Sequence, residues 1–151
     1  VLASLSLLFY AAIVLTIFKL WPVTLSLASF GGFIVSLGMA VDANVLIFER
    51  FKEELRKGRT VTAAVEEGFN RAWSAIIDSN VTTIIACIIL IWLASSVISS
   101  AQMMGFAVTL LIGVIISMFT AVVITRTLLR VFVSTGLGKN TRLYLMEWGK
   151  K

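Results

Sequence analysis

Four long apolar runs dominate the sequence and limit what it can fold into. They cover about residues 1–18, 23–48, 79–97 and 103–129. A helix needs roughly 20 apolar residues to cross the hydrocarbon core of a bilayer, and each run is close to or above that length. Charged residues make up only 14% of the chain, whereas soluble domains contain about 25%. The sequence therefore predicts an all-α membrane protein with a bundle of four transmembrane helices.

The basic residues gather on one side of this predicted bundle. Six lie between residues 49 and 71, six more lie from Arg126 onward, and only Lys19 lies on the other side. Loops rich in lysine and arginine face the cytoplasm, so we expect loop 49–78 and a tail at 134–151 to be cytoplasmic. Because the charges flank apolar runs, as membrane topology requires, the net charge of +5 does not predict nucleic-acid binding.

A separate amphipathic helix is predicted between the second and third runs, at about 60–77. Apolar residues recur there at helical spacing, polar residues take the opposite face, and Thr60 is a candidate N-cap. We expect this helix to lie along the cytoplasmic membrane surface. The alternatives are a helix that packs as in a soluble protein, or a calmodulin-type target.

Small residues follow one face of the second run and one face of the fourth. In the fourth run they recur every four residues, beginning with Gly105, Thr109 and Gly113, and in the second Gly31 and Gly38 fall roughly on one face. Close helix packing in lipid depends on small residues, so we expect these two faces to meet. The alternative is that they reflect the higher glycine content of membrane helices in general.

Asp42 is an acidic residue inside the second apolar run, in the stretch GMAVDANVLIFER. It lies about 9 Å before the run ends at Phe48, at 1.5 Å per residue. A carboxylate in lipid is expensive, and taking up a proton relieves that cost, which suits a reversible proton carrier. A structural hydrogen bond, or a side chain that reaches the nearby membrane edge, is the alternative. Four hydroxyl residues fall near the same depth and predict a supporting polar layer, namely Thr82, Thr83, Ser117 and Thr120.

The remaining polar residues have simpler interpretations. Asp78 begins the third run, where a carboxylate caps a helix N-terminus, and a second ionisable site is the alternative. Glu49 and Arg50 mark the membrane interface, and Cys87 is expected to pack in the bundle. The chain has no histidine and one cysteine, so no metal site is expected. It has no phosphate-binding loop either, so we expect no enzyme and no cofactor, and any energy must come from a gradient or a partner.

Three stretches of the chain resemble the SecD members of the bacterial SecD/SecF family. They are GMAVDANVLIFERFKEELRKGR, AAVEEGFNRAWSAIIDSNVTTII and MGFAVTLLIGVIISMFTAVVITRTLL, and the match covers roughly Ser29–Val133. Val41 before Asp42 and the pair Glu49-Arg50 favour SecD over SecF. The resemblance implies the last four of six membrane helices. We therefore expect a fragment or a processed chain, as the start in an apolar run without methionine also suggests.

The resemblance also implies a role, partners and a location. The family belongs to the resistance–nodulation–division superfamily, and it is implied to help the SecYEG translocon of the bacterial plasma (inner) membrane to pull secreted proteins outward, driven by the proton gradient. It implies SecF and YajC as partners, the lipid bilayer as surroundings, and unfolded secretory proteins bound by a domain absent from this chain. It assigns Asp42 a part in proton passage, with a basic partner on SecF. The alternatives are a small-molecule exporter of the same superfamily and a structural membrane scaffold.

Overall fold

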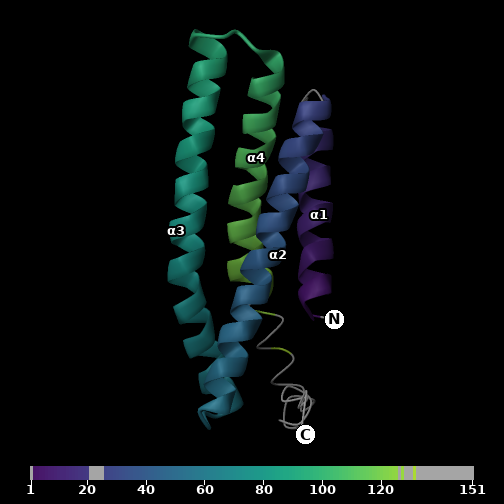
Figure 1. Ribbon diagram of the computed structural model, residues 1–151. Coiled ribbons are helices and arrows are strands. Elements are labelled where there is room, and N and C mark those ends of the chain that lie inside the picture. The colour runs from purple at the N-terminus through teal and green to yellow at the C-terminus, as the bar shows by residue number, and fades with distance from the viewer. Residues whose placement is uncertain (1, 21–25, 126, 128–130, 132–151) are drawn as a thin grey trace, which may run out of the picture.

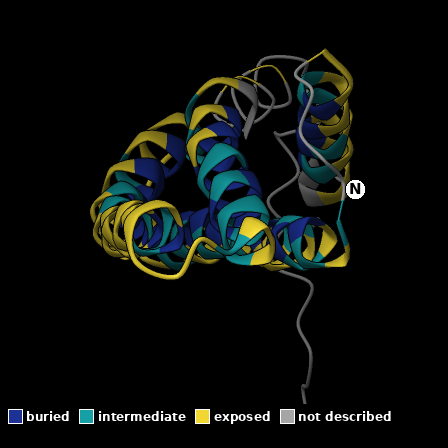
Figure 2. Cartoon of the chain, turned by 90° about the horizontal axis from the view of Figure 1, so that it is seen from above, coloured by how far each residue is buried: buried dark blue, intermediate teal, exposed yellow. Residues whose placement is uncertain are grey.

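The computed structural model describes residues 2–20, 26–125, 127 and 131. These residues form a bundle of α-helices. In chain order they are α1 (Leu2–Leu20), α2 (Leu27–Arg56), α3 (Val61–Ser96) and α4 (Ala101–Thr120), and α4 continues into a π-helical turn, η1 (Ala121–Thr125). Successive helices run in opposite directions, and α1 lies beside α2 (Figure 1). Seen from above, the buried turns face the interior of the bundle and the exposed turns face outward (Figure 2).

Three of the four helices are long and apolar enough to cross a membrane. They are α2, α3 and α4 with its extension to Val123, whereas the apolar part of α1, Ser4–Leu20, is shorter. Length and composition thus support three of the four predicted spans directly. The predicted tail at 134–151 lies outside the described residues.

The prediction of a separate amphipathic helix at 60–77 is wrong, because this segment is the first half of α3. That helix is continuous over 36 residues, and Thr60 occupies its N-cap position without a side-chain capping hydrogen bond. The sequence between Phe69 and Met104 contains no glycine or proline, so nothing local interrupts the helix. At 1.5 Å per residue α3 is about 54 Å long, well beyond a hydrocarbon core of roughly 30 Å. Its charged first half therefore continues without a break into the apolar half as one helix.

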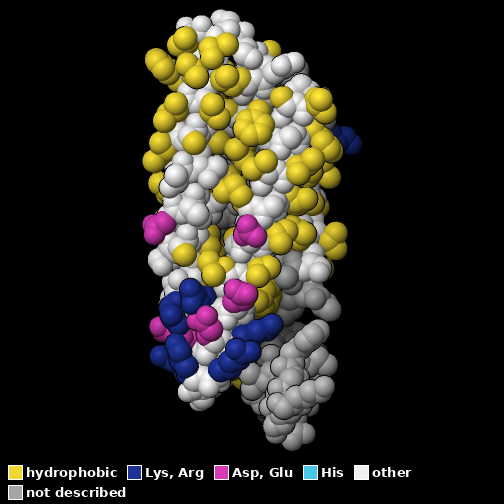
Figure 3. Space-filling model, viewed as in Figure 1, with side chains coloured by type: hydrophobic (Ala, Val, Ile, Leu, Met, Phe, Trp, Pro, Cys, Tyr) yellow, Lys and Arg dark blue, Asp and Glu magenta, His cyan; other side chains and the backbone are white. Residues whose placement is uncertain are grey.

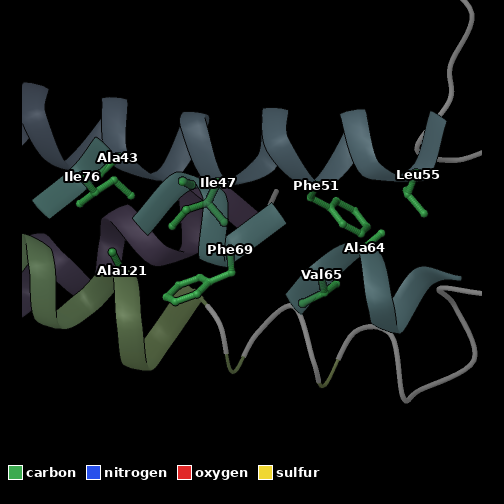
Figure 4. Packing of buried hydrophobic residues seen from close by; sticks show 10 residues of the cluster. Ala43, Ile47, Phe51, Leu55, Ala64, Val65, Phe69, Ile76 and Ala121 are labelled. Atoms are coloured by element: carbon green, nitrogen blue, oxygen red, sulfur yellow. The ribbon is translucent and has the colours of Figure 1, made fainter. Parts of the chain in front are cut away.

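The apolar face of this first half packs against the end of α2. Phe69 and Ile76 of α3 join Ile47 and Phe51 of α2 in one buried cluster (Figure 4). Gly68 allows the two backbones to approach, since a Cβ placed on it would lie 2.7 Å from the backbone nitrogen of Phe51. The face that was expected to meet lipid is thus used to join two helices.

Helices α2 and α4 meet through small residues. Thr109 Oγ1 donates a hydrogen bond to the backbone oxygen of Ser29 at 3.0 Å, across the interface. A Cβ on Gly105 would lie 2.5 Å from Ser29 Oγ, and a Cβ on Gly113 would overlap the side chain of Ser36. Small residues on α4 therefore let serines of α2 fit between the two helices, as close packing in lipid requires.

On α2 the contact face differs from the predicted one. A Cβ on Gly32 would lie 2.6 Å from the backbone oxygen of Phe106, so Gly32 faces α4. Gly31 only approaches the Phe106 ring, at 3.9 Å, and Gly38 has nothing within 4 Å. The prediction used the glycines of α2 to choose its contact face and did not consider the serines. The small serine side chains are what contact α4 on this helix.

Candidate functional site

Asp42 lines an open groove between α2 and α3. The groove has a volume of about 230 Å³, and the residues that line it with Asp42 are Met39, Ala43, Leu46, Ile76, Ser79 and Asn80. Asp42 is exposed in this chain although it lies in the middle of α2, within its apolar part. An exposed carboxyl group in the middle of an apolar helix must contact water, lipid or another protein. Contact with lipid has the highest free-energy cost of the three.

Apolar clusters lie on both sides of the groove along the bundle. Toward the loop between α2 and α3, Ile76 and Ala43 belong to the cluster around Phe51. Toward the opposite end, Cys87 packs with residues of α4, and Met39 packs against that cluster. The groove thus lies between two apolar clusters, and Asp42 is exposed at its open side.

The polar groups of the groove on α3 are Ser79 and Asn80, which the sequence analysis did not select. Ser79 Oγ donates a hydrogen bond to the backbone oxygen of Ile76 at 3.1 Å, and Asn80 Nδ2 donates to the same oxygen at 2.8 Å. Asn80 is 3% exposed, and so is Asn44 on α2. The sequence pattern that could have pointed to these asparagines is a repeated Asp-x-Asn, in DAN on α2 and DSN on α3. In both helices the aspartate is exposed and the asparagine is buried.

The four hydroxyl residues predicted to support Asp42 bond to their own helices. Thr82 donates to the backbone oxygen of Asp78 and Thr83 to that of Ser79. Ser117 donates to Val114 and Thr120 to Ile116, again through backbone oxygens. A serine or threonine inside a helix readily reaches the carbonyl three or four residues before it. In the described residues, none of these hydroxyls forms a hydrogen bond with Asp42.

Asp78 does not cap a helix, and that interpretation is wrong. Since α3 begins at Val61, Asp78 lies in its middle, where it is exposed. It does not line the groove beside Asp42. Its interpretation as a second ionisable site stays a prediction.

A second acidic site lies near the end of α2, beyond the apolar part that ends at Phe48. The side chain of Glu54 is 1% exposed and faces three cations. Lys57 Nζ lies 2.5 Å and Arg71 Nη1 2.6 Å from its Oε1, and Arg59 Nε lies 3.0 Å from its Oε2. Most of the described acidic and basic side chains gather at this end of the bundle, below a largely apolar surface (Figure 3).

The cations stabilise the charged form of the glutamates at this end. The hydrogen bond from Lys57 lowers the pKa of Glu54, burial opposes it, and the hydrogen bond from Arg71 lowers it further. Arg50, which was expected to mark the interface, bonds Glu53 at 2.8 Å and lowers the pKa of that carboxyl. Both glutamates are therefore held as anions in a network that joins α2 to α3.

Comparisons of sequence place the chain among protein-export membrane proteins. Residues 1–135 match the family described as protein export membrane protein SecD/SecF, C-terminal. A protein translocase subunit SecD of Dehalococcoides mccartyi (strain VS) is 63% identical over 97% of this chain and 32% of its own length. The corresponding subunit of Synechocystis sp. is 52% identical over 95% of this chain and 30% of its own length. The chain thus spans about a third of the relatives that it matches.

The fold agrees with a solved structure of the same group. The crystal structure of SecDF from Thermus thermophilus, described as a translocon-associated membrane protein, aligns with a TM-score of 0.82 and 39% sequence identity. The alignment covers 89% of this chain and 18% of that one. The chain therefore belongs to the SecD/SecF family of protein-export membrane proteins, and it corresponds to the C-terminal membrane part of SecD.

Proposed function

We propose that this chain is the membrane part of the SecD subunit of an accessory complex that promotes protein export through the Sec translocon. The proton-motive force drives this complex, and Asp42 takes part in proton passage. The observation that carries the proposal is the groove between α2 and α3, which exposes one carboxyl group in the middle of an apolar helix. The role in export rests on the relatives, which are translocase subunits.

The surroundings of Asp42 suit a group that gains and loses a proton. In the described part of the chain, no basic side chain lines the groove, so no ion pair there neutralises the carboxylate. Protonation removes the charge and with it most of the cost of placing this side chain at membrane depth. A change in the charge of Asp42 therefore changes the free energy of exposing the groove to lipid, water or a partner protein. Coupling to a proton gradient requires such a difference between the protonated and the ionised state.

The open side of the groove is where we place the partner. SecF would cover Asp42 there and supply a basic side chain, and SecYEG and YajC would complete the assembly. The basic residues near the α2–α3 turn support a cytoplasmic position for that end, on the inner side of the bacterial plasma membrane. The domain that binds unfolded secretory proteins lies outside this chain.

Export by the full-length protein tests this proposal. Replacing Asp42→Asn keeps the size of the side chain and removes its ionisation, so proton-coupled export of a secreted reporter should be lost while the complex still assembles. The matched control is Glu49→Gln, which removes a carboxylate two turns along the same helix, outside the apolar run. Unimpaired export by the Asp42→Asn variant would refute the proposed role and favour a structural scaffold.

A further inference from the structure

Two tryptophans, Trp73 and Trp92, bracket the apolar part of α3. They lie 19 residues apart in the sequence, about 28 Å at 1.5 Å per residue, and Asp78 is the one charged residue between them. This length is close to the roughly 30 Å of a hydrocarbon core, and tryptophan is enriched at both edges of that core. The spacing therefore places Trp73 where α3 leaves the hydrocarbon, at the charged end of the bundle.

The charged side chains at this end then fall at the depth of the lipid headgroups. Arg71 lies two residues before Trp73, about 3 Å further along the helix axis. The headgroup layer is roughly 5–7 Å thick on each side of the hydrocarbon, so Arg71 lies within it. On α2, Arg50 lies two residues beyond Phe48, where the apolar part of that helix ends, and so at a similar depth. Figure 3 shows the basic side chains gathered at this end of the surface.

Three of these side chains, Lys57, Arg59 and Arg71, form a cation cluster around the carboxylate of Glu54. A lysine carries three N–H donors and an arginine five, so the two oxygens of one carboxylate cannot use them all. The three side chains are 55%, 47% and 41% exposed, which leaves the unused donors accessible from outside the protein. Because Glu54 already holds these donors together, a further acceptor binds at a lower entropic cost.

The cation cluster also keeps a net positive charge. Two other described carboxylates approach it, Glu67 at 3.7 Å from Arg59 and Glu53 at 3.6 Å from Arg71. Glu53 is itself paired more closely with Arg50, at 2.8 Å. The three cations are thus set against their central carboxylate and one at the margin, which leaves one positive charge. A ligand with one negative charge and several acceptor oxygens fits this remainder, and a phosphodiester is such a ligand.

We propose that the cation cluster binds the phosphate of an anionic lipid headgroup at the charged end of the bundle. Arg59 and Arg71 each present N–H groups in a planar fork, which suits the oxygens of a phosphate. Free inorganic phosphate has the same chemistry, but only a lipid is held at this depth by its acyl chains. The inference goes beyond the proposed function, since it does not depend on the role of Asp42 in proton passage.

Native mass spectrometry of the full-length protein with its partner subunits can count the lipids that stay bound. Phosphatidylglycerol, the zwitterionic phosphatidylcholine and inorganic phosphate are titrated separately. Arg59→Gln removes one cation of the cluster in the exposed turn between α2 and α3. Lys52→Gln is the matched control, because Lys52 is exposed at the same end and has the same charge but lies outside the cluster.

The wild type should bind phosphatidylglycerol at lower concentration than phosphatidylcholine. Arg59→Gln should raise the half-saturating concentration of phosphatidylglycerol about fivefold, whereas Lys52→Gln should change it less than twofold. Arg59→Lys should lie between the wild type and Arg59→Gln, because it keeps the charge and loses the fork. If Arg59→Gln does not fold, Lys57→Gln carries the same expectation and decides in its place.

Three results would overturn the inference. Equal shifts in Arg59→Gln and Lys52→Gln would show that net charge alone attracts the lipid and that the cluster is no site. Equal binding of phosphatidylglycerol and phosphatidylcholine by the wild type would show that the leftover charge selects nothing. Displacement of phosphatidylglycerol by inorganic phosphate at equal concentration would assign the cluster to a free anion and not to a lipid.

Discussion

Two carboxyl groups on α2 lie in opposite surroundings, although the same helix, α3, packs beside both. Glu54 is buried and meets three cations, whereas Asp42 is exposed in a groove whose described lining contains none. Compensation holds the charge of Glu54 in place, and the pKa of its carboxyl is lowered accordingly. Asp42 has no such compensation among the side chains that line its groove. One carboxylate therefore fastens two helices, and the other faces an open groove.

The helix packing differs in the same way between these two regions. Near Glu54 the backbones of α2 and α3 almost touch, at Gly68 and Phe51. Beside Asp42 the two helices leave a groove. We infer that the charged end is a fixed joint and that the groove is the part of this pair able to admit water or a partner.

The largest loss of stability is expected from separating α2 and α3 where they pack most closely. A side chain on Gly68 would meet the Phe51 backbone, which cannot move aside, so Gly68→Leu should destabilise the protein by about 3 kcal/mol or more. Gly38→Ala is the control, since a Cβ there meets nothing within 4 Å and alanine favours helix by about 1 kcal/mol over glycine. Thermal unfolding of the full-length protein in detergent measures both. Equal stability of the two variants would show that α2 and α3 are not tightly joined there.

A smaller effect is expected from removing the charge of Glu54. Glu54→Gln should lower the unfolding midpoint by several degrees, because three cations lose their shared partner. Those cations are about half exposed and can be hydrated, which limits the loss. Asp42→Asn should leave the midpoint unchanged or raise it, since it removes an uncompensated charge. A lower unfolding midpoint for Asp42→Asn than for Glu54→Gln would contradict the difference drawn between the two carboxyl groups.

The sequence was sufficient for the helical class and for locating Asp42 within an apolar helix. Apolar length predicts spans, and a lone acid at membrane depth stands out in any such run. The family resemblance is confirmed by the family match over residues 1–135. These features could be predicted because each depends on a single segment of the chain.

Features that depend on how two helices face each other were harder to predict. Whether residues 60–77 lie on a membrane or against another helix cannot be told from their periodicity, since both environments select the same apolar face. The face of α2 that meets α4 was misplaced because serine packs as closely as glycine when its hydroxyl finds a backbone oxygen, as Ser36 does with Phe33. Asn80 was missed because the third span was assumed to begin at Ser79, which left the asparagine at a helix start and not beside Asp42.

Proton uptake by the full-length complex in proteoliposomes tests the central claim most directly. An imposed proton gradient should drive flux in the wild type and in Glu54→Gln, corrected for the amount of folded protein, and flux should be lost in Asp42→Asn. This result would assign proton passage to the groove carboxyl and a structural role to the buried one. Flux that persists in Asp42→Asn and disappears in Glu54→Gln would contradict the account.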